Sequence, residues 1–130
     1  MVVDASAILA IIQKEMGWEA FDRCLKERRE PAFITPINAW EVAARLLKEG
    51  VDLHMETAFD VIESYRIGVA PTDETQAMMA MKAQYQFGKG RHPVALNMGD
   101  CFAYALMRFR EDRLLFKGDD FTKTDLEPAL

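Results

Sequence analysis

The sequence predicts one α/β domain in which a parallel sheet is covered by helices on both faces. Short apolar, β-branched runs alternate with longer amphipathic segments, and strands separated by helices of this length favour parallel pairing. The chain has 130 residues, the size of one domain, with no Pro/Ser-rich linker, repeat or second hydrophobic core. Half of its residues are hydrophobic, which excludes a wholly disordered chain. We therefore treat residues 1–130 as a single domain.

Breaks in the pattern set the predicted elements. Glycine or proline ends several apolar runs, and Asn97 is a candidate cap for the last helix. The segment 88–99 is predicted as a loop. The predicted strands are 1–3, 32–35, 67–70 and 114–116. The predicted helices are 5–14, 18–29, 36–49, 53–65, 73–85 and 100–110.

Composition excludes several classes of protein. Sixteen basic and 21 acidic side chains give a net charge of −5, which argues against a general, charge-driven nucleic-acid binder but leaves room for a local basic patch around an acidic site. Two cysteines, Cys24 and Cys101, are too few for a disulfide framework. No apolar run approaches the roughly 20 residues that span a bilayer, and the first residues lack the pattern of a signal peptide. We expect a soluble, cytoplasmic protein with no membrane segment.

Acidic residues gather at one predicted edge of the sheet. Asp4 ends the first strand, and Asp119 and Asp120 follow the fourth. Glu41 and Asp100 lie near the starts of helices, which face the same edge in such folds. Ligands of open parallel sheets bind at that edge, beyond the carboxyl ends of the strands. The sequence therefore predicts that carboxylates from four separate segments meet in one place.

Each acid also has a purely local interpretation. Asp4 can cap the following helix, with Ser6 as its hydrogen-bond partner. Glu41 can pair with the arginine four residues later, and Asp100 can simply favour the dipole of its helix. The segment 118–120 can be a plain turn. The prediction of a site rests on the convergence of the acids, not on any one of them.

Clustered carboxylates point to a divalent cation. Three or four of them in one pocket repel each other, and oxygen ligands without Cys or His suit Mg²⁺ or Mn²⁺. Such ions orient a water for in-line attack on a phosphodiester, chemistry that needs no covalent nucleophile. The chain has no G-x-S-x-G elbow and no glycine-rich nucleotide loop, and His54 and His92 form no zinc motif.

The loop before Asp100 carries positive and hydrogen-bond-donating groups. We predict that Lys89, Arg91 and His92 grip the phosphates of a substrate, although the same composition is found in an ordinary solvated loop. Further cations could extend this patch if they lie at the acidic edge. They are Arg45, Arg108, Lys117 and Lys123.

Three segments of the chain resemble VapC-type PIN-domain toxins. Residues 88–106, GKGRHPVALNMGDCFAYAL, resemble the long central signature of that family. Residues 2–7, VVDASA, and 114–125, LLFKGDDFTKTD, resemble its first and last motifs. The similarity runs through the whole chain in order. It implies a Mg²⁺-dependent endoribonuclease, the toxin of a type II toxin–antitoxin pair, with a three-layer PIN fold around a parallel sheet of four or five strands.

The resemblance also implies roles for individual residues. By position, Asp4, Glu41 and Asp100 match the first three acids of the family, and Asp120 matches the fourth, with Asp119 as the alternative. Asp4 and Asp100 would be direct metal ligands, and Glu41 and Asp120 would bind a second ion or hold water. The resemblance implies that two further side chains orient the carboxylates. These are Ser6 and Asn97.

Family members form homodimers and are inhibited by an antitoxin that places an arginine in the acidic pocket. A guanidinium suits that role because it forks onto carboxylates. The surface around Trp18 and Phe21 and the 53–65 helix are candidate antitoxin sites, although core packing is favoured for each single residue. Two other functions remain open: a receiver-like, non-catalytic binding module, and a Mg²⁺-dependent phosphatase with an aspartyl nucleophile. The first needs paired acids at the first strand and the second needs D-x-D there, whereas this chain has Asp4-Ala5-Ser6.

Overall fold

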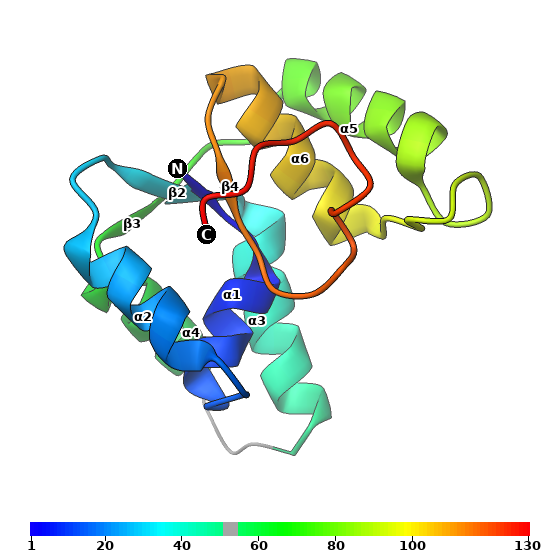
Figure 1. Cartoon of the computed structure of the whole chain (residues 1–130). Coiled ribbons are helices and arrows are strands. Elements are labelled where there is room, and N and C mark those ends of the chain that lie inside the picture. The colour runs from blue at the N-terminus through cyan, green and yellow to red at the C-terminus, as the bar shows by residue number, and fades with distance from the viewer. Residues whose placement is uncertain (51–54) are drawn as a thin grey trace.

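Four parallel strands form the centre of the molecule in a computed structural model, which describes residues 1–50 and 55–130 (Figure 1). The order across the sheet is β3-β2-β1-β4. This confirms the predicted parallel sheet, which has four strands in the described part of the chain. The strands are β1 (Val2–Val3), β2 (Ala32–Ile34), β3 (Ile67–Val69) and β4 (Leu114–Leu115).

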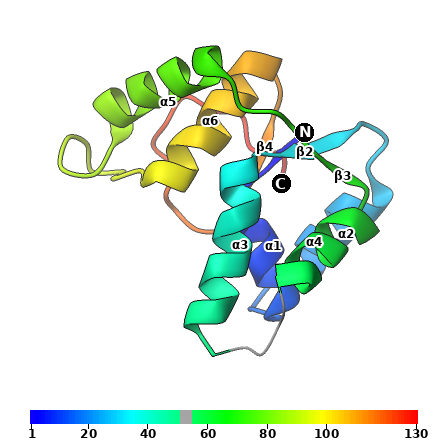
Figure 2. The same ribbon diagram turned by 180° about the vertical axis from the view of Figure 1, so that it is seen from behind.

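Helices connect the strands and cover both faces of the sheet (Figures 1 and 2). They are α1 (Ala5–Ile12), α2 (Trp18–Glu27), α3 (Pro36–Lys48), α4 (Met55–Ser64), α5 (Glu74–Phe87) and α6 (Met98–Arg110). Residue 53, the predicted start of the fourth helix, and His54 lie outside the described residues. None of the helices among the described residues has the length and apolarity that a membrane-spanning segment requires.

Alternating side chains of the strands divide the core in two. Val3 and Leu115 pack with residues of α1 to α4, whereas Val2 and Leu114 pack with residues of α5 and α6. Because successive residues of a strand point to opposite faces, even a two-residue strand contributes to both cores. The result is the predicted three-layer sandwich.

Several helix boundaries differ from the prediction by one or two residues, and two of the differences have local reasons. The first helix ends at Ile12 rather than at residue 14, and Lys14 adopts a left-handed backbone with φ 50°. The last helix begins at Met98 rather than at residue 100, because Asn97 caps it and lets two loop residues join its first turn. The predicted loop therefore ends at residue 97.

The predicted antitoxin surface on α2 is largely core. Phe21 is buried, and Trp18 is partly buried against the same cluster. Their helix presents the apolar face that its spacing predicted, with Leu25 as its most buried member. Core packing, the favoured interpretation for single residues, thus holds for this helix.

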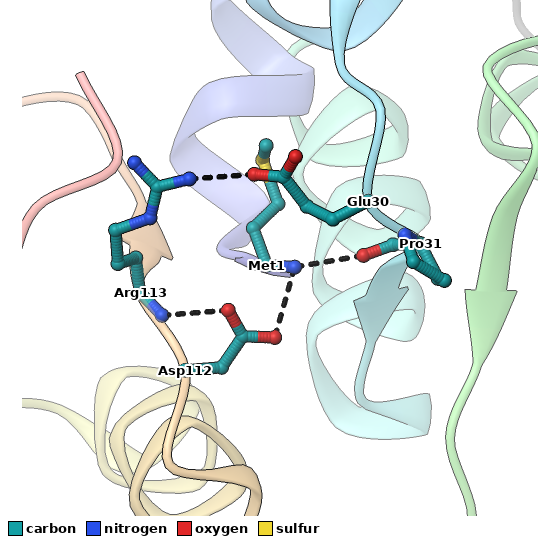
Figure 3. Close-up of polar contacts among 5 residues, drawn as sticks. All are labelled: Met1, Glu30, Pro31, Asp112 and Arg113. Carbon is teal, nitrogen blue, oxygen red and sulfur yellow. Dashed lines mark hydrogen bonds and ion pairs between the residues drawn. The ribbon is translucent and has the colours of Figure 1, made fainter.

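Polar contacts fasten the edge at which the strands begin (Figure 3). The amine of Met1 donates to the carbonyl of Pro31 at 2.7 Å and pairs with the Asp112 carboxylate at 2.9 Å. Arg113 pairs with Glu30 at 2.5 Å. These residues directly precede β1, β2 and β4, so the contacts fix the starts of three strands relative to one another.

Candidate active site

An acidic cleft of about 320 Å³ opens at the opposite edge, beyond the carboxyl ends of β1 and β4. Five carboxylates line it. The four that the sequence predicts are Asp4 from the end of β1, Glu41 from α3, Asp100 from the start of α6 and Asp120 from the segment after β4. The fifth is Glu15, which follows α1 and pairs with Lys117. The predicted convergence of acids from four distant segments is therefore seen in the structure.

Asp4 is held by both of its oxygens. Its side chain is almost completely buried. Oδ2 accepts hydrogen bonds from the Ser6 amide at 2.9 Å and the Ser6 hydroxyl at 2.5 Å, and Oδ1 accepts from Asn38 Nδ2 at 3.0 Å. Asp4 thus caps α1, as its local interpretation predicted, and also points into the cleft. The two interpretations are compatible.

Asp100 is held by a capping box at the start of α6. Its Oδ2 accepts from the Asn97 amide at 2.8 Å, and the Asp100 amide donates to Asn97 Oδ1 at 2.9 Å. Only 6% of Asp100 is exposed. The cap fixes the direction of the carboxylate, so the structure gives Asn97 the geometry of an orienting residue.

Glu41 lies on α3 without a direct partner among the described residues. The predicted pair with Arg45 does not form, because Arg45 Nε is paired with Glu49 at 2.6 Å, although the Arg45 charge still lowers the pKa of Glu41 in part. Glu41 packs instead against Gly99: a Cβ atom added there would lie 3.0 Å from Glu41 Cδ and closer still to Oε2. The missing side chain at residue 99 therefore makes room for the carboxylate.

The acids raise each other's pKa values. Burial is the main cause of the raised pKa of Asp4, and the charge of Asp120 adds to it. Burial and the charge of Asp4 likewise raise the pKa of Glu41. Burial, together with the charges of Asp4, Asp120 and Glu41, raises the pKa of Asp100 to about 7. The two cations in the cleft lining, Arg45 and Lys117, pair with Glu49 and Glu15 rather than with these acids, so a bound cation would offset the remaining negative charge.

The donor set fits a divalent cation that keeps part of its water shell. In residues 1–50 and 55–130, no three Asp, Glu, His or Cys side chains are arranged to hold a metal ion together. Mg²⁺ is bound in many enzymes by one or two carboxylates and several waters, and it prefers oxygen ligands. Four carboxylates around a cleft of this size suit that mode of binding, with some acids acting through water.

The structure separates the two acids after β4. Asp120 lines the cleft, whereas Asp119 does not; its carbonyl accepts the Thr122 hydroxyl at 2.8 Å in the turn that leads to the buried Phe121. Neighbouring residues in a turn point in different directions. Of the two candidates, Asp120 therefore has the position of the fourth acid.

The predicted basic loop does not line the cleft. The Arg91 guanidinium lies over the Tyr85 ring at 4.6 Å, and the His92 ring packs edge-on against Phe87 at 5.5 Å. Lys89 is exposed. Of the cations expected to extend a patch, Arg45 and Lys117 line the cleft, whereas Arg108 pairs with Asp125 elsewhere. Lys123 is exposed outside the cleft lining.

Asn38 is the functional candidate that sequence reasoning missed. It is fully buried, and its Nδ2 donates both to Asp4 and to the Gly99 carbonyl at 3.2 Å, while the Thr35 hydroxyl donates to its Oδ1. Asn38 thus joins β1, α3 and α6 beneath the cleft. A buried-looking position occupied by an amide, three residues before a candidate acid, was the available signal.

Comparison with known proteins agrees with this geometry. The PIN domain family model matches residues 1–127. Ribonuclease VapC42 of Mycobacterium tuberculosis is 36% identical over 130 residues, covering 99% of this chain and 98% of its own. VapC ribonuclease R02377 of Rhizobium meliloti is 32% identical over 139 residues, covering 95% and 97%. The crystal structure of M. tuberculosis VapC20, titled a Sarcin-Ricin loop cleaving toxin, matches the fold with TM-score 0.78 at 13% identity, covering 96% and 95% of the two chains.

The fold and the acidic cleft are those of a PIN domain. The chain belongs to the PIN-domain family and, within it, to the VapC ribonucleases that it matches over nearly its whole length.

Proposed function

We propose that this chain is an endoribonuclease toxin that hydrolyses RNA phosphodiester bonds in its acidic cleft. The observation that carries the proposal is the convergence of four carboxylates from distant segments in a chain of this family. VapC relatives that share about a third of its residues are ribonucleases by name. The reaction class is thus phosphodiester hydrolysis, in which the oxygen of water bonds to phosphorus and the bond from phosphorus to the leaving oxygen breaks.

The cofactor we propose is Mg²⁺ or Mn²⁺, in keeping with the metal dependence of the family. When bound, such an ion activates water and stabilises charge on the leaving oxygen. Asp4 and Asp100 are the proposed direct ligands, and Glu41 and Asp120 complete the negative pocket. Hydrogen bonds from neighbouring groups hold the first two carboxylates in place, so little reorganisation is needed when the ion and substrate enter. The donors are Ser6, Asn38 and the amide of Asn97.

The proposed partners are RNA, a cognate antitoxin and a second copy of the chain. A cleft with an excess of negative charge attracts an arginine as well as a metal ion, and a guanidinium can fork onto paired carboxylates. An antitoxin arginine would therefore compete with the cofactor directly. RNA as substrate implies a cytoplasmic location. The grip of Lys89, Arg91 and His92 on RNA stays a prediction, since Arg45 and Lys117 lie closer to the acids.

The two alternative functions lack support at the first strand. A receiver domain needs paired acids there, and an aspartyl phosphatase needs a second aspartate two residues after its nucleophile. This chain has Ser6 at that position, and its hydroxyl donates to Asp4.

The test is cleavage of a mixed pool of structured and single-stranded RNAs by the purified protein with Mg²⁺ or Mn²⁺. We expect cuts that disappear with EDTA and in Asp4→Asn and Asp100→Asn variants. Asp60→Asn is the matched control, because Asp60 is an exposed acid of α4 outside the cleft. Metal-independent cuts, or cuts that survive both substitutions, would contradict the proposed active site.

A further inference from the structure

A second, apolar groove adjoins the acidic cleft. Its volume is about 200 Å³, and its apolar walls come from α3 and from the start of α6. Two residues, Glu41 and Asn97, line both the groove and the cleft. The remaining lining residues are Ile37, Trp40, Met98 and Gly99. Whatever occupies the groove therefore lies directly beside the acids.

Large apolar side chains are exposed on both sides of this groove. Trp40 is 60% exposed and Met98 is 59% exposed. Trp40 immediately precedes Glu41 on α3, and Met98 is two residues before Asp100 on α6. An exposed tryptophan beside an acidic cleft forms a flat surface next to a negatively charged pocket, which packing alone does not require.

The groove is rigid relative to the acids. Asn38 Nδ2 bonds to both Asp4 and the Gly99 carbonyl, which ties α3 to the first turn of α6. At Gly99 the backbone approaches the Glu41 carboxylate so closely that a side chain would displace it. The two walls are thus fixed by the same contacts that hold the carboxylates.

We propose that this groove binds a nucleobase of the RNA substrate, stacked on Trp40, next to the phosphodiester that is cleaved. This inference rests on the proposed function. A nucleotide whose phosphate lies among the acids carries its base within reach of the neighbouring groove, and every base has a π-face that stacks on an indole. The side-chain oxygen of Asn97 is bonded to the Asp100 amide, so the groove offers mainly apolar contact. Recognition there depends on stacking rather than on the hydrogen-bonding edge of the base.

Tryptophan fluorescence tests the contact without catalysis. The chain has two tryptophans, so in a Trp18→Phe, Asp100→Asn variant Trp40 is the sole reporter. We expect a short single-stranded oligoribonucleotide to quench its emission, and the same oligonucleotide made abasic to leave it unchanged. Equal quenching by both, or none by either at concentrations that saturate binding, overturns the proposal.

Kinetics test the consequence for the reaction. Removing a stacking surface weakens binding of one base by about tenfold or more, so Trp40→Ala should reduce kcat/KM for RNA by that factor, and Trp40→Phe should recover most of it. Leu47→Ala is the control, since Leu47 is also exposed on α3 but does not line the groove.

The outcomes separate this inference from the proposed function. If the unmodified protein cleaves RNA and Trp40→Ala cleaves it equally well, only the base-binding groove is wrong. If the unmodified protein cleaves no RNA, the proposed function fails, and the fluorescence experiment still decides whether a base contacts Trp40. If Trp40→Ala changes the oligomeric state in light scattering while kcat/KM per active site is unchanged, a second copy covers the groove and the proposal is overturned.

Discussion

The two edges of the sheet differ in how their charged side chains are arranged. Where the strands begin, Asp112 pairs with the amine of Met1, and Arg113 pairs with Glu30 (Figure 3). Where the strands end, five carboxylates line one cleft, and burial and proximity raise the pKa values of three of them. Paired charges stabilise a fold, whereas crowded charges of one sign cost stability. The second arrangement is therefore the better indication of function.

Pocket volume alone would place the active site at the wrong edge of the sheet. A pocket of about 610 Å³, nearly twice the volume of the acidic cleft, lies near the starts of β2 and β3 and is lined by several cations. The central cation there, Arg28, donates to the carbonyls of Leu25, Tyr65 and Arg66, at the ends of α2 and α4. It satisfies helix ends that would otherwise lack partners, so its role is structural.

The largest effect is expected from adding one more charge to the acidic edge. Asn38→Asp would place a further carboxylate against Asp4, where the Asn38 amide now lies at 3.0 Å. We expect RNA cleavage to fall at least a hundredfold, measured as kcat/KM, because Asp4 loses its donor and gains a repulsive neighbour. Asn38→Ala, which removes the donor without adding charge, should lose less. Equal activity in Asn38→Asp and the unmodified protein would contradict the role of Asn38.

The next effect is on stability as a function of pH. The folded-state pKa of Asp100 is about 7, against 3.8 as its ordinary value, so between these values the folded protein binds more protons than the unfolded chain. Stability of the metal-free protein should therefore fall as pH rises from about 4 to 7, by on the order of 3 kcal/mol from this group. Denaturant unfolding with EDTA at several pH values measures it.

Asp100→Asn should flatten this dependence, leaving the smaller contributions of Asp4 and Glu41, whose pKa values are raised in the same direction. At pH 8, Mg²⁺ should stabilise the unmodified protein more than the Asp100→Asn variant. Stability that rises from pH 4 to pH 7 in the unmodified, metal-free protein, by more than it does in the variant, would contradict the assignment.

A structural cation should affect stability without affecting catalysis. Arg28→Ala removes three hydrogen bonds to carbonyl groups and should lower the free energy of unfolding by about 1–3 kcal/mol. RNA cleavage at a temperature where the variant is folded should be unchanged. The matched control is Arg29→Ala, an exposed neighbour, which should change stability by less than about 0.5 kcal/mol. A loss of activity in folded Arg28→Ala would show that this edge also takes part in the reaction.

The smallest effect is expected at the exposed ion pair between Arg113 and Glu30. Their side chains are 43% and 40% exposed, and water screens exposed pairs strongly. A double-mutant cycle with Arg113→Ala and Glu30→Ala, measured in low and high salt, should give a coupling that is small beside the effect of Arg28→Ala and that decreases with salt. A larger coupling would mean that the pair acts with the Met1 contacts as one network.

Sequence reasoning went furthest where a residue's role depends on local order. The places of Asp4, Glu41 and Asp100 follow from short strands, helix starts and the direction of a parallel sheet. Asn38 could not be found in this way, because its partner Asp4 is 34 residues away and an asparagine inside a helix has no distinctive spacing.

Whether the other predicted residues line the cleft depends on the direction of their side chains, which spacing in the sequence does not determine. Asp119 and Asp120 are adjacent residues of the same type, so the sequence does not tell which of them lines the cleft. The turn that leads to Phe121 decides it. Arg91 and His92 looked like substrate contacts because of their charge. In the structure, the aromatic side chains of Tyr85 and Phe87 hold them outside the cleft lining.

One hydroxyl group joins the beginning of the fold to its last strand. Ser6 Oγ donates to Asp4 and accepts from the amide of Lys117 at 3.0 Å, across 111 positions in the sequence. Lys117 lies two residues after the end of β4, and Asp120 lies three residues further on. During translation, the first acid therefore emerges from the ribosome long before the segment that completes its cleft. A nuclease that is synthesised beside abundant RNA thus cannot complete this active site before residues 117–120 have been made.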